Sequence, residues 1–172
     1  MAKYIAFLRG INVGKIRIKM TDLKAAFENM GCEEVRTYLQ TGNVVFNSGE
    51  NIAALKTQLQ QGLSTTFNYE AYVLLHEYAS LEKTIAGYPF ERDDEHHAYI
   101  AFVENTTALK EIENAAMSLD NNIDQVKIGD GVVYWKVKVG STLDTPFSKI
   151  LAKPKYKSCV TMRNLNTLEK MV

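Results

Sequence analysis

The sequence has few cysteines and no long apolar segment. Its two cysteines, Cys32 and Cys159, lie far apart and form no CxxC motif, which indicates free thiols in a reducing compartment rather than a disulfide scaffold. No apolar run approaches the roughly 20 residues that a transmembrane helix needs. The apolar stretch at the N-terminus is short and is interrupted by Arg9, so it does not resemble a signal peptide. We therefore expect a cytoplasmic protein with no membrane association.

An excess of charge of either sign is also absent. The 172 residues include 20 basic and 20 acidic side chains, and the isoelectric point lies near 6.8. A protein that binds nucleic acid or membrane surfaces without specificity usually carries a basic excess, so the overall charge argues against both classes. At 46% hydrophobic residues, the chain is long enough to bury a core as one domain or two small ones.

Motifs for metal binding and nucleophilic catalysis are missing as well. The chain has no HExxH, no CxxC and no GxSxG motif. His96 and His97 are adjacent, so on a strand their side chains point to opposite faces and cannot bind one metal together. We expect the acidic residues Asp93, Asp94 and Glu95 beside them to form a solvated loop. The sequence predicts no metal and no cofactor, and with no catalytic constellation it leaves open whether the protein is an enzyme.

The first half of the chain shows the order β-α-β-β-α-β. Its opening strand is apolar on both faces, which is typical of a central strand. Alternating charge and isoleucine over 15–19 suggests a short exposed strand, and Thr21 is a candidate N-cap for the helix that follows. The predicted elements are strand 3–8, helix 22–30, strands 34–39 and 43–47, helix 51–66 and strand 71–75.

The same order recurs in the second half. An Asp-Gly turn at 129–131 marks a hairpin, and Asn164 or Asn166 is a candidate cap for a last helix. The predicted elements are a connecting helix 78–86, strand 97–103, helix 108–119, strands 124–128 and 132–139, helix 147–151 and strand 158–162. The fold class is therefore α+β, with two tandem ferredoxin-like halves and a short C-terminal helix. We place the halves at residues 1–76 and 96–172, with a helical linker and charged loop at 77–95.

The loop that leaves the first strand is the leading candidate for a ligand site. Only three residues separate Gly10 from Gly14, and Ile16 follows Lys15, so the loop is neither a phosphate-binding P-loop nor a dinucleotide-binding motif. Two interpretations stay open. The loop is either a structural turn whose glycines adopt positive φ, or an anion site formed by Arg9, Gly10, Asn12, Gly14 and Lys15.

Five motifs, in order, resemble a large uncharacterised bacterial family, a domain of unknown function of about this length. They are Leu8-Arg-Gly-Ile-Asn-Val-Gly14, Met20-Thr-Asp-Leu23, Val35-Arg-Thr-Tyr-Leu-Gln-Thr-Gly-Asn-Val44, Pro89-Phe90 and Thr161-Met-Arg-Asn-Leu-Asn-Thr167. The chain departs from the family at Lys15, where a second glycine is common, and at Leu165, where a tryptophan is common. The resemblance implies a two-part ferredoxin-like fold and brings no activity with it.

The resemblance also singles out a hairpin motif with no assigned role, formed by Tyr38, Gln40, Thr41, Gly42 and Asn43. We expect the first and third strands to be parallel neighbours, which would place this motif at the opposite end of the sheet from Arg9.

Two basic segments, 9–19 and 149–163, contain no acidic residue and coincide with the first and last motifs. The leading hypothesis is a small anionic ligand, a class that includes phosphate-bearing compounds, that contacts the first loop together with Arg163 and Asn164. An ordinary solvated surface is the competing interpretation.

A second hypothesis places single-stranded RNA on the second sheet. Tyr134 and Lys136 share a strand face, on which Lys127 and Tyr99 are also expected, and RNA-binding sheets stack bases on such aromatic side chains. The aromatic motif of those folds is missing, so nucleic acid is a weaker expectation. A third hypothesis is that the motifs are purely structural. The oligomeric state is left open.

Overall fold

The computed structural model describes all 172 residues, which divide into two compact units. Unit 1 consists of Met1–Lys83 and Lys170–Val172, and unit 2 of Thr84–Glu169. The division falls within helix α3 (Tyr78–Ala86), inside the segment 77–95 that we predicted to be a linker. None of the helices combines the length and the apolar character needed to cross a bilayer. Both cysteines are buried free thiols.

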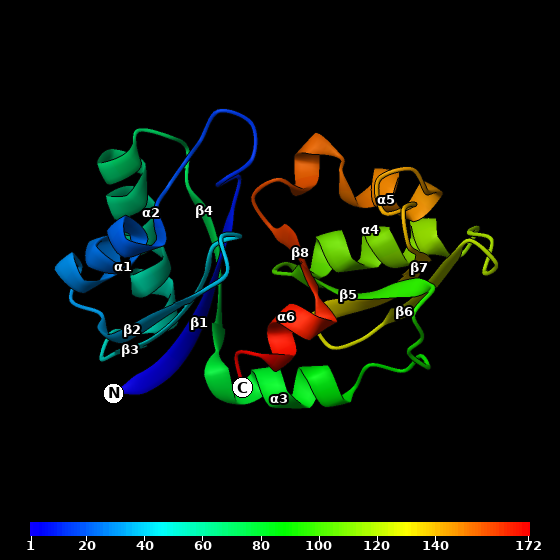
Figure 1. Ribbon diagram of the computed structural model, residues 1–172, viewed down its shortest axis with the longest axis horizontal. Coiled ribbons are helices and arrows are strands. Elements are labelled where there is room, and N and C mark those ends of the chain that lie inside the picture. Colours follow the sequence, from blue (N-terminus) through cyan, green and yellow to red (C-terminus); the bar gives the residue numbers. More distant parts are fainter. The chain divides into compact units, whose positions relative to one another are not determined.

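Unit 1 is a four-stranded antiparallel sheet with two helices on one face (Figure 1). The strands follow the order β2-β3-β1-β4, and each pair of neighbours is antiparallel. This is the ferredoxin-like arrangement. Its elements are β1 (Ala2–Arg9), α1 (Met20–Asn29), β2 (Glu33–Tyr38), β3 (Asn43–Ser48), α2 (Ile52–Phe67) and β4 (Tyr72–Glu77).

The core of unit 1 follows from the apolar pattern of its elements. Along β1, Tyr4, Ala6 and Leu8 belong to the cluster that the helices cover, while Ile5 and Phe7 are buried on the other face. Both faces of the strand are therefore covered, as its sequence predicts. Helix α2 contributes Leu55, Leu59 and Leu63 to the same cluster. These residues recur every four positions and so share one helix face.

Two details near the start of unit 1 differ from the prediction. Residues 15–19 form no strand, because Ile18 is buried and Ile16 packs against the core. The alternating isoleucines thus anchor a loop instead of forming one face of a strand. Helix α1 begins at Met20, and its N-cap is Lys19, which makes no side-chain capping bond, so Thr21 lies inside the helix. At α2 the prediction is confirmed, since the Asn51 Oδ1 accepts a 3.0 Å hydrogen bond from the Ala54 N–H.

Unit 2 repeats the topology of unit 1. Its strand order is β6-β7-β5-β8, again antiparallel throughout, and α4 and α5 lie on one face of the sheet (Figure 1). The predicted α+β fold of two ferredoxin-like halves with a short C-terminal helix is therefore confirmed. The elements are β5 (His96–Val103), α4 (Thr106–Ala116), β6 (Asp124–Ile128), β7 (Val132–Lys138), α5 (Pro146–Leu151), a 3-10 turn η1 (Pro154–Tyr156), β8 (Val160–Asn164) and α6 (Leu165–Glu169).

A buried carboxylate joins three elements of unit 2. Asp124 of β6 is only 1% exposed. It accepts a 2.8 Å hydrogen bond from the indole N–H of Trp135 in β7, and a 3.2 Å bond from the backbone N–H of Phe147 in α5. The rings of Trp135 and Phe147 meet edge to face at 5.3 Å between centroids. Asp124 thus fixes the indole and the start of α5 at the centre of the core, where unpaired N–H groups would be costly.

The direction of β1 relative to β3 differs from our expectation, and this changes which motifs lie close together. We expected a parallel pair, but the two strands are antiparallel, with Phe7 opposite Asn43. The reason is topological. The helical crossover returns β2 in the direction of β1, and the hairpin then reverses the chain into β3. The end of β1 and the Thr41-Gly42-Asn43 motif therefore lie at the same end of the sheet.

Gly42 allows the two segments to approach closely. Its carbonyl accepts a 2.8 Å hydrogen bond from the Leu8 N–H. A Cβ at this position would lie 2.8 Å from the Leu8 Cβ and 2.8 Å from the Ile11 Cδ1, and the backbone φ is +79°. Such distances are too short for carbon atoms that are not bonded, so only glycine fits without a rearrangement.

We expect Gly42→Ala to lower the free energy of unfolding by about 1–3 kcal/mol more than Gly10→Ala. Both glycines have φ +79°, and both substitutions therefore carry the cost of a left-handed backbone, but a Cβ on Gly10 would meet no atom within 4 Å. Urea denaturation of the two variants measures the difference. Equal losses would contradict the close approach at Gly42.

We expect Asp124→Ala to lower the free energy of unfolding by about 3 kcal/mol, because it leaves two buried N–H groups without an acceptor. Calorimetric unfolding measures the loss. Asp130→Ala is the matched control, because Asp130 is exposed in the turn between β6 and β7, and its removal should change stability by less than about 0.5 kcal/mol. Similar losses in the two variants would show that Asp124 does not have this role.

Candidate functional site

The β1–α1 loop, which we define as residues 10–19, is shaped by its own asparagine. Gly10, Asn12 and Gly14 have positive φ, a conformation that glycine and asparagine tolerate better than other residues. The Asn12 Oδ1 accepts a 2.9 Å hydrogen bond from the Ile18 N–H, and its Nδ2 donates to the Ile18 carbonyl at 3.2 Å. Asn12 therefore holds the loop in a closed turn.

The same side chain connects the loop to the hairpin motif. The Asn12 Nδ2 also donates a 2.7 Å hydrogen bond to the carbonyl of Gln40. Within the hairpin, the amide of the fully buried Asn43 donates to the Tyr38 carbonyl at 2.9 Å and to the Thr41 Oγ1 at 2.7 Å. The structure thus brings together two motifs that we had expected at opposite ends of the sheet. In both motifs, the asparagine amide makes hydrogen bonds that define the shape of the backbone.

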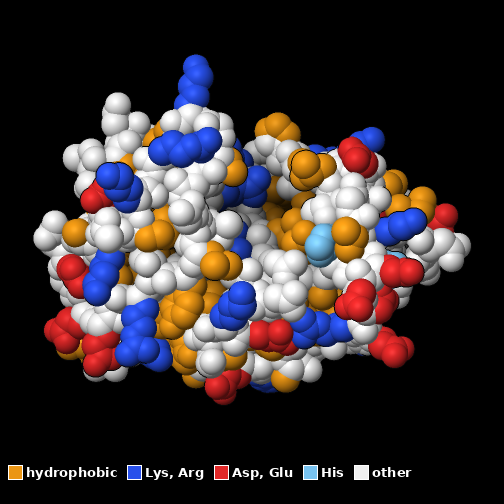
Figure 2. Space-filling model, viewed as in Figure 1, with side chains coloured by type: hydrophobic (Ala, Val, Ile, Leu, Met, Phe, Trp, Pro, Cys, Tyr) orange, Lys and Arg blue, Asp and Glu red, His pale blue; other side chains and the backbone are white.

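The basic side chains of the β1–α1 loop have no acidic partners. Lys15, Arg17 and Lys19 are exposed, and no carboxylate forms an ion pair with them. The guanidinium of Arg17 donates only to the neighbouring Ile16 carbonyl, at 3.3 Å. In Figure 2, the part of unit 1 that corresponds to this loop shows basic side chains without acidic ones beside them. Arg9, the last residue of β1, is half-buried opposite Tyr72 of β4.

Arg163 and Asn164, the other predicted ligand residues, belong to β8 in unit 2. Arg163 is 9% exposed, and its Nη1 donates to the Thr161 Oγ1 at 2.8 Å and to the Met162 carbonyl at 3.0 Å. The Asn164 Oδ1 accepts a 2.9 Å hydrogen bond from the Asn166 N–H. Asn164 therefore caps the short helix α6. It was one of the two residues predicted for that role.

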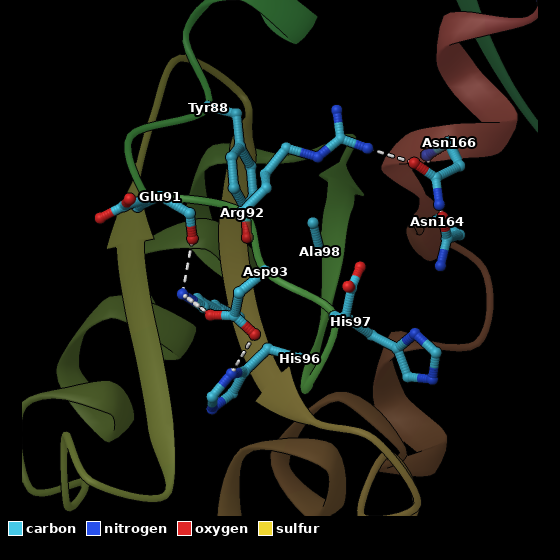
Figure 3. Close-up of a pocket in the computed structure, with 11 residues that line it drawn as sticks. Tyr88, Glu91, Arg92, Asp93, His96, His97, Ala98, Asn164 and Asn166 are labelled. Carbon is cyan, nitrogen blue, oxygen red and sulfur yellow. Dashed lines mark hydrogen bonds and ion pairs between the residues drawn. The ribbon is translucent and has the colours of Figure 1, made fainter.

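Unit 2 also contains a polar pocket that the sequence did not predict. Its volume is about 240 Å³, and it is lined by residues of the segment 88–98, by Lys136 of β7, and by Asn164 and Asn166 (Figure 3). We expected the charged stretch that enters this pocket to be a solvated loop. Residues 91–95 are all exposed, as expected, and within this loop Asp93 forms a 2.8 Å ion pair with Lys136 and a 2.7 Å contact with the His96 Nδ1. The stretch therefore folds against the sheet through specific polar contacts.

These contacts determine the charge state of the pocket. Hydrogen bonds from the Lys136 ammonium and then from His96 hold the pKa of the Asp93 carboxyl well below its usual range. Lys136, whose side chain is 10% exposed, also donates a 2.5 Å hydrogen bond to the Glu91 carbonyl. Burial raises the pKa of Tyr88 to about 12, so its hydroxyl stays protonated and donates to the Trp135 carbonyl at 3.3 Å. The Asp93 carboxyl therefore stays ionised at neutral pH.

Two features of the sequence could have indicated this pocket. The Pro89-Phe90 motif leads directly into the charged stretch, and Lys136 stands between apolar residues on a strand. A lysine at such a position needs a nearby counter-charge when the strand is covered. The sequence does not show that Lys136 and Asp93 are close together, because they are 43 positions apart and meet only in the folded chain.

The strand face proposed for RNA is covered within unit 2. Tyr134 is 8% exposed, its hydroxyl donates a 2.8 Å hydrogen bond to the Thr84 carbonyl, and the ring of Tyr88 packs edge-on against it at 6.0 Å. Lys127 lies opposite Tyr134, as expected. Tyr99 does not, since it pairs with Trp135 on the other face. A base would have to displace Tyr88 to stack on Tyr134.

The two adjacent histidines point in different directions (Figure 3). His96 faces Asp93, while His97 contacts the ring of Tyr99 at 5.8 Å. No group of three or more histidine, cysteine, aspartate or glutamate side chains has the arrangement of a metal site.

Comparisons with known proteins agree with the fold and the motifs. Residues 1–134 match the family described as "Protein of unknown function (DUF1697)". A comparison with curated proteins found no match. Among solved structures, "The structure of conserved bacterial protein SP0830 from Streptococcus pneumoniae" is similar, with a TM-score of 0.82 and 24% identity over 99% of this chain and 96% of that chain. At 24% identity, this similarity supports the fold alone. The motifs and the match over residues 1–134 lead to one conclusion, that the chain belongs to the DUF1697 family of proteins of unknown function.

Proposed function

We propose that unit 1 binds a small anionic ligand, such as a phosphate-bearing metabolite, at the β1–α1 loop. The observation that carries this proposal is the set of three exposed cations, Lys15, Arg17 and Lys19, that have no ion-pair partner. The sequence as a whole has as many acidic as basic residues, so unpaired cations on one loop mark a local positive field. Such a field attracts anions and positions them near the loop.

The length of the loop is a second argument for a functional role. In unit 2, only residues 104 and 105 separate β5 from α4, whereas in unit 1 residues 10–19 separate β1 from α1. The two crossovers have the same topology, so the fold itself does not require the longer connection. Loops that exceed what the fold needs often carry function.

The loop is also open and already shaped for binding. A Cβ placed on Gly10 or Gly14 would meet no atom within 4 Å, so a ligand could approach the backbone at both glycines. The three hydrogen bonds of the Asn12 side chain fix the turn between them. A fixed turn avoids part of the entropic cost of ordering a loop when a ligand binds. Arg9, at the end of β1 in the same unit, stays a predicted ligand contact.

The geometry favours this proposal over the two alternatives. RNA stacking on the second sheet needs an exposed Tyr134, and that ring is almost fully buried. A purely structural role explains Asn12, Gly42 and Asn43, whose groups shape the backbone. It does not explain why Lys15, Arg17 and Lys19 extend from the same loop without partners.

We expect the double variant Lys15→Ala/Lys19→Ala to weaken the binding of inorganic phosphate, pyrophosphate or ATP, whichever the protein binds, by at least about tenfold. This corresponds to about 1.4 kcal/mol from two lost charge-assisted contacts. Chemical shifts of the labelled protein, followed in a titration at low and at moderate salt, give the affinity. Because the contacts are exposed, the affinity of the wild-type protein should fall as salt rises.

The matched control is Lys110→Ala, which removes an exposed, unpaired lysine of α4 in unit 2 and should leave the affinity unchanged. Asn12→Ala distinguishes the structural alternative. That alternative predicts a lower melting temperature and no binding by any variant. Absence of binding by the whole panel, or equal weakening by Lys110→Ala, would refute the proposed function.

A further inference from the structure

We propose that the polar pocket of unit 2 binds a small zwitterion of amino-acid size, with its carboxylate held by Arg92, Asn164 and Asn166 and its ammonium held by Asp94. This site lies within unit 2 and does not depend on the anion site proposed for unit 1. The proposal follows from the size of the pocket and from the polar groups that its own hydrogen bonds leave unused.

The size of the pocket limits the ligand to a small molecule. The pocket has a volume of about 240 Å³. This lies below the 300–1,000 Å³ typical of sites for drug-sized ligands. The pocket therefore suits a molecule of amino-acid size better than a nucleotide with its phosphates.

One side of the pocket has several hydrogen-bond donors without partners. The Arg92 guanidinium donates to the Glu169 Oε1 at 2.5 Å and to the Asn166 Oδ1. These bonds use two of its five N–H groups, so three remain. The Asn164 Oδ1 is likewise occupied, by the Asn166 N–H. With both amide oxygens engaged, the two side chains offer their NH₂ groups. Figure 3 shows Arg92, Asn164 and Asn166 on the same side of the pocket. A fork of N–H groups beside two amides matches a carboxylate.

The pocket also contains a carboxylate without an ion-pair partner. Asp93 is compensated by Lys136 and His96, and the carboxylate of Glu91 points away from the pocket (Figure 3). Asp94 also lines the pocket, and no cation pairs with it. An ammonium group beside Asp94 would restore the charge balance there.

The donors and the carboxylate together select against simple ions. A plain anion would meet the uncompensated charge of Asp94, and a plain amine would leave the donors of Arg92, Asn164 and Asn166 unused. Since donors and acceptors that a ligand covers but leaves unpaired reduce affinity, a molecule that carries both charges fits better than either half. Recognition therefore depends on both ends of the ligand.

A titration of the labelled protein with the twenty standard amino acids tests the proposal. We expect at least one to shift the amide signals of residues 91–98 and 164–166 in a saturable way. Its N-acetyl derivative, which lacks the ammonium, and its methyl ester, which lacks the carboxylate, should each bind at least about tenfold more weakly. Binding by none of the twenty, or equal binding by either derivative, would overturn the proposal.

Two substitutions that preserve the fold assign the ends of the ligand. Asp94→Asn should weaken the parent amino acid at least about tenfold and leave the N-acetyl derivative unchanged. Asn164→Asp keeps the oxygen that caps α6 but replaces the amide donor by a negative charge, so it should abolish carboxylate binding without lowering the melting temperature. Asp130→Asn, at the exposed turn after β6, is the control and should change nothing. Wild-type affinity in both test variants would show that the ligand lies elsewhere.

Discussion

The antiparallel pairing of β1 with β3 is the constraint on which the organisation of unit 1 depends. It puts Phe7 opposite Asn43 and so brings the end of β1 beside the hairpin between β2 and β3. Two segments that are about 30 residues apart in the sequence then share one end of the sheet. They approach closely because Gly42 has no side chain, and the Asn12 amide ties the loop to the Gln40 carbonyl. Two of the family motifs are thus parts of one local structure, which explains why both are rich in glycine and asparagine.

Unit 2 has the same contact between the end of its first strand and a hairpin glycine, but without a long loop. There, the N–H of Val103 donates to the Gly131 carbonyl at 2.9 Å, just as the Leu8 N–H donates to the Gly42 carbonyl at 2.8 Å. Both glycines have positive φ, so the repeat extends to the turn that follows the second strand of each half. After this shared junction the units differ, because β5 passes almost directly into α4 while β1 is followed by the ten residues of the β1–α1 loop. The comparison separates the part of unit 1 that makes the fold from the part that is added to it.

The sequence was sufficient for the order of the elements and the fold, because periodicity and turn residues are local signals. Asn51 as the cap of α2 and the Asp-Gly turn before β7 are examples. It was not sufficient where a long-range contact decides the outcome. The isoleucines at 16 and 18 have the spacing of a strand, and only their burial against the helices of unit 1 shows that they anchor a loop. Asp93 and Lys136 each carry an ordinary charge in the sequence, and the pocket exists because the fold brings them to 2.8 Å. The candidate residues of the β1–α1 loop were visible as a motif, but their attachment to the hairpin was not.

The two candidate sites use charge in different ways, and this difference bears on what each can recognise. Lys15, Arg17 and Lys19 are exposed and unpaired, so their field extends into solvent over about 10 Å before salt screens it. A field of this kind would attract anions with little discrimination of shape. In unit 2, Asp93 and Arg92 are each held by two partners, and each charge is therefore nearly cancelled at a distance. What remains there is a set of hydrogen-bond donors and one carboxylate without an ion-pair partner, which would act on a ligand only at contact. The chain has 20 basic and 20 acidic residues, yet these charges are unevenly placed. The β1–α1 loop is suited to attracting anions, and the polar pocket of unit 2 is suited to distinguishing ligands by their shape.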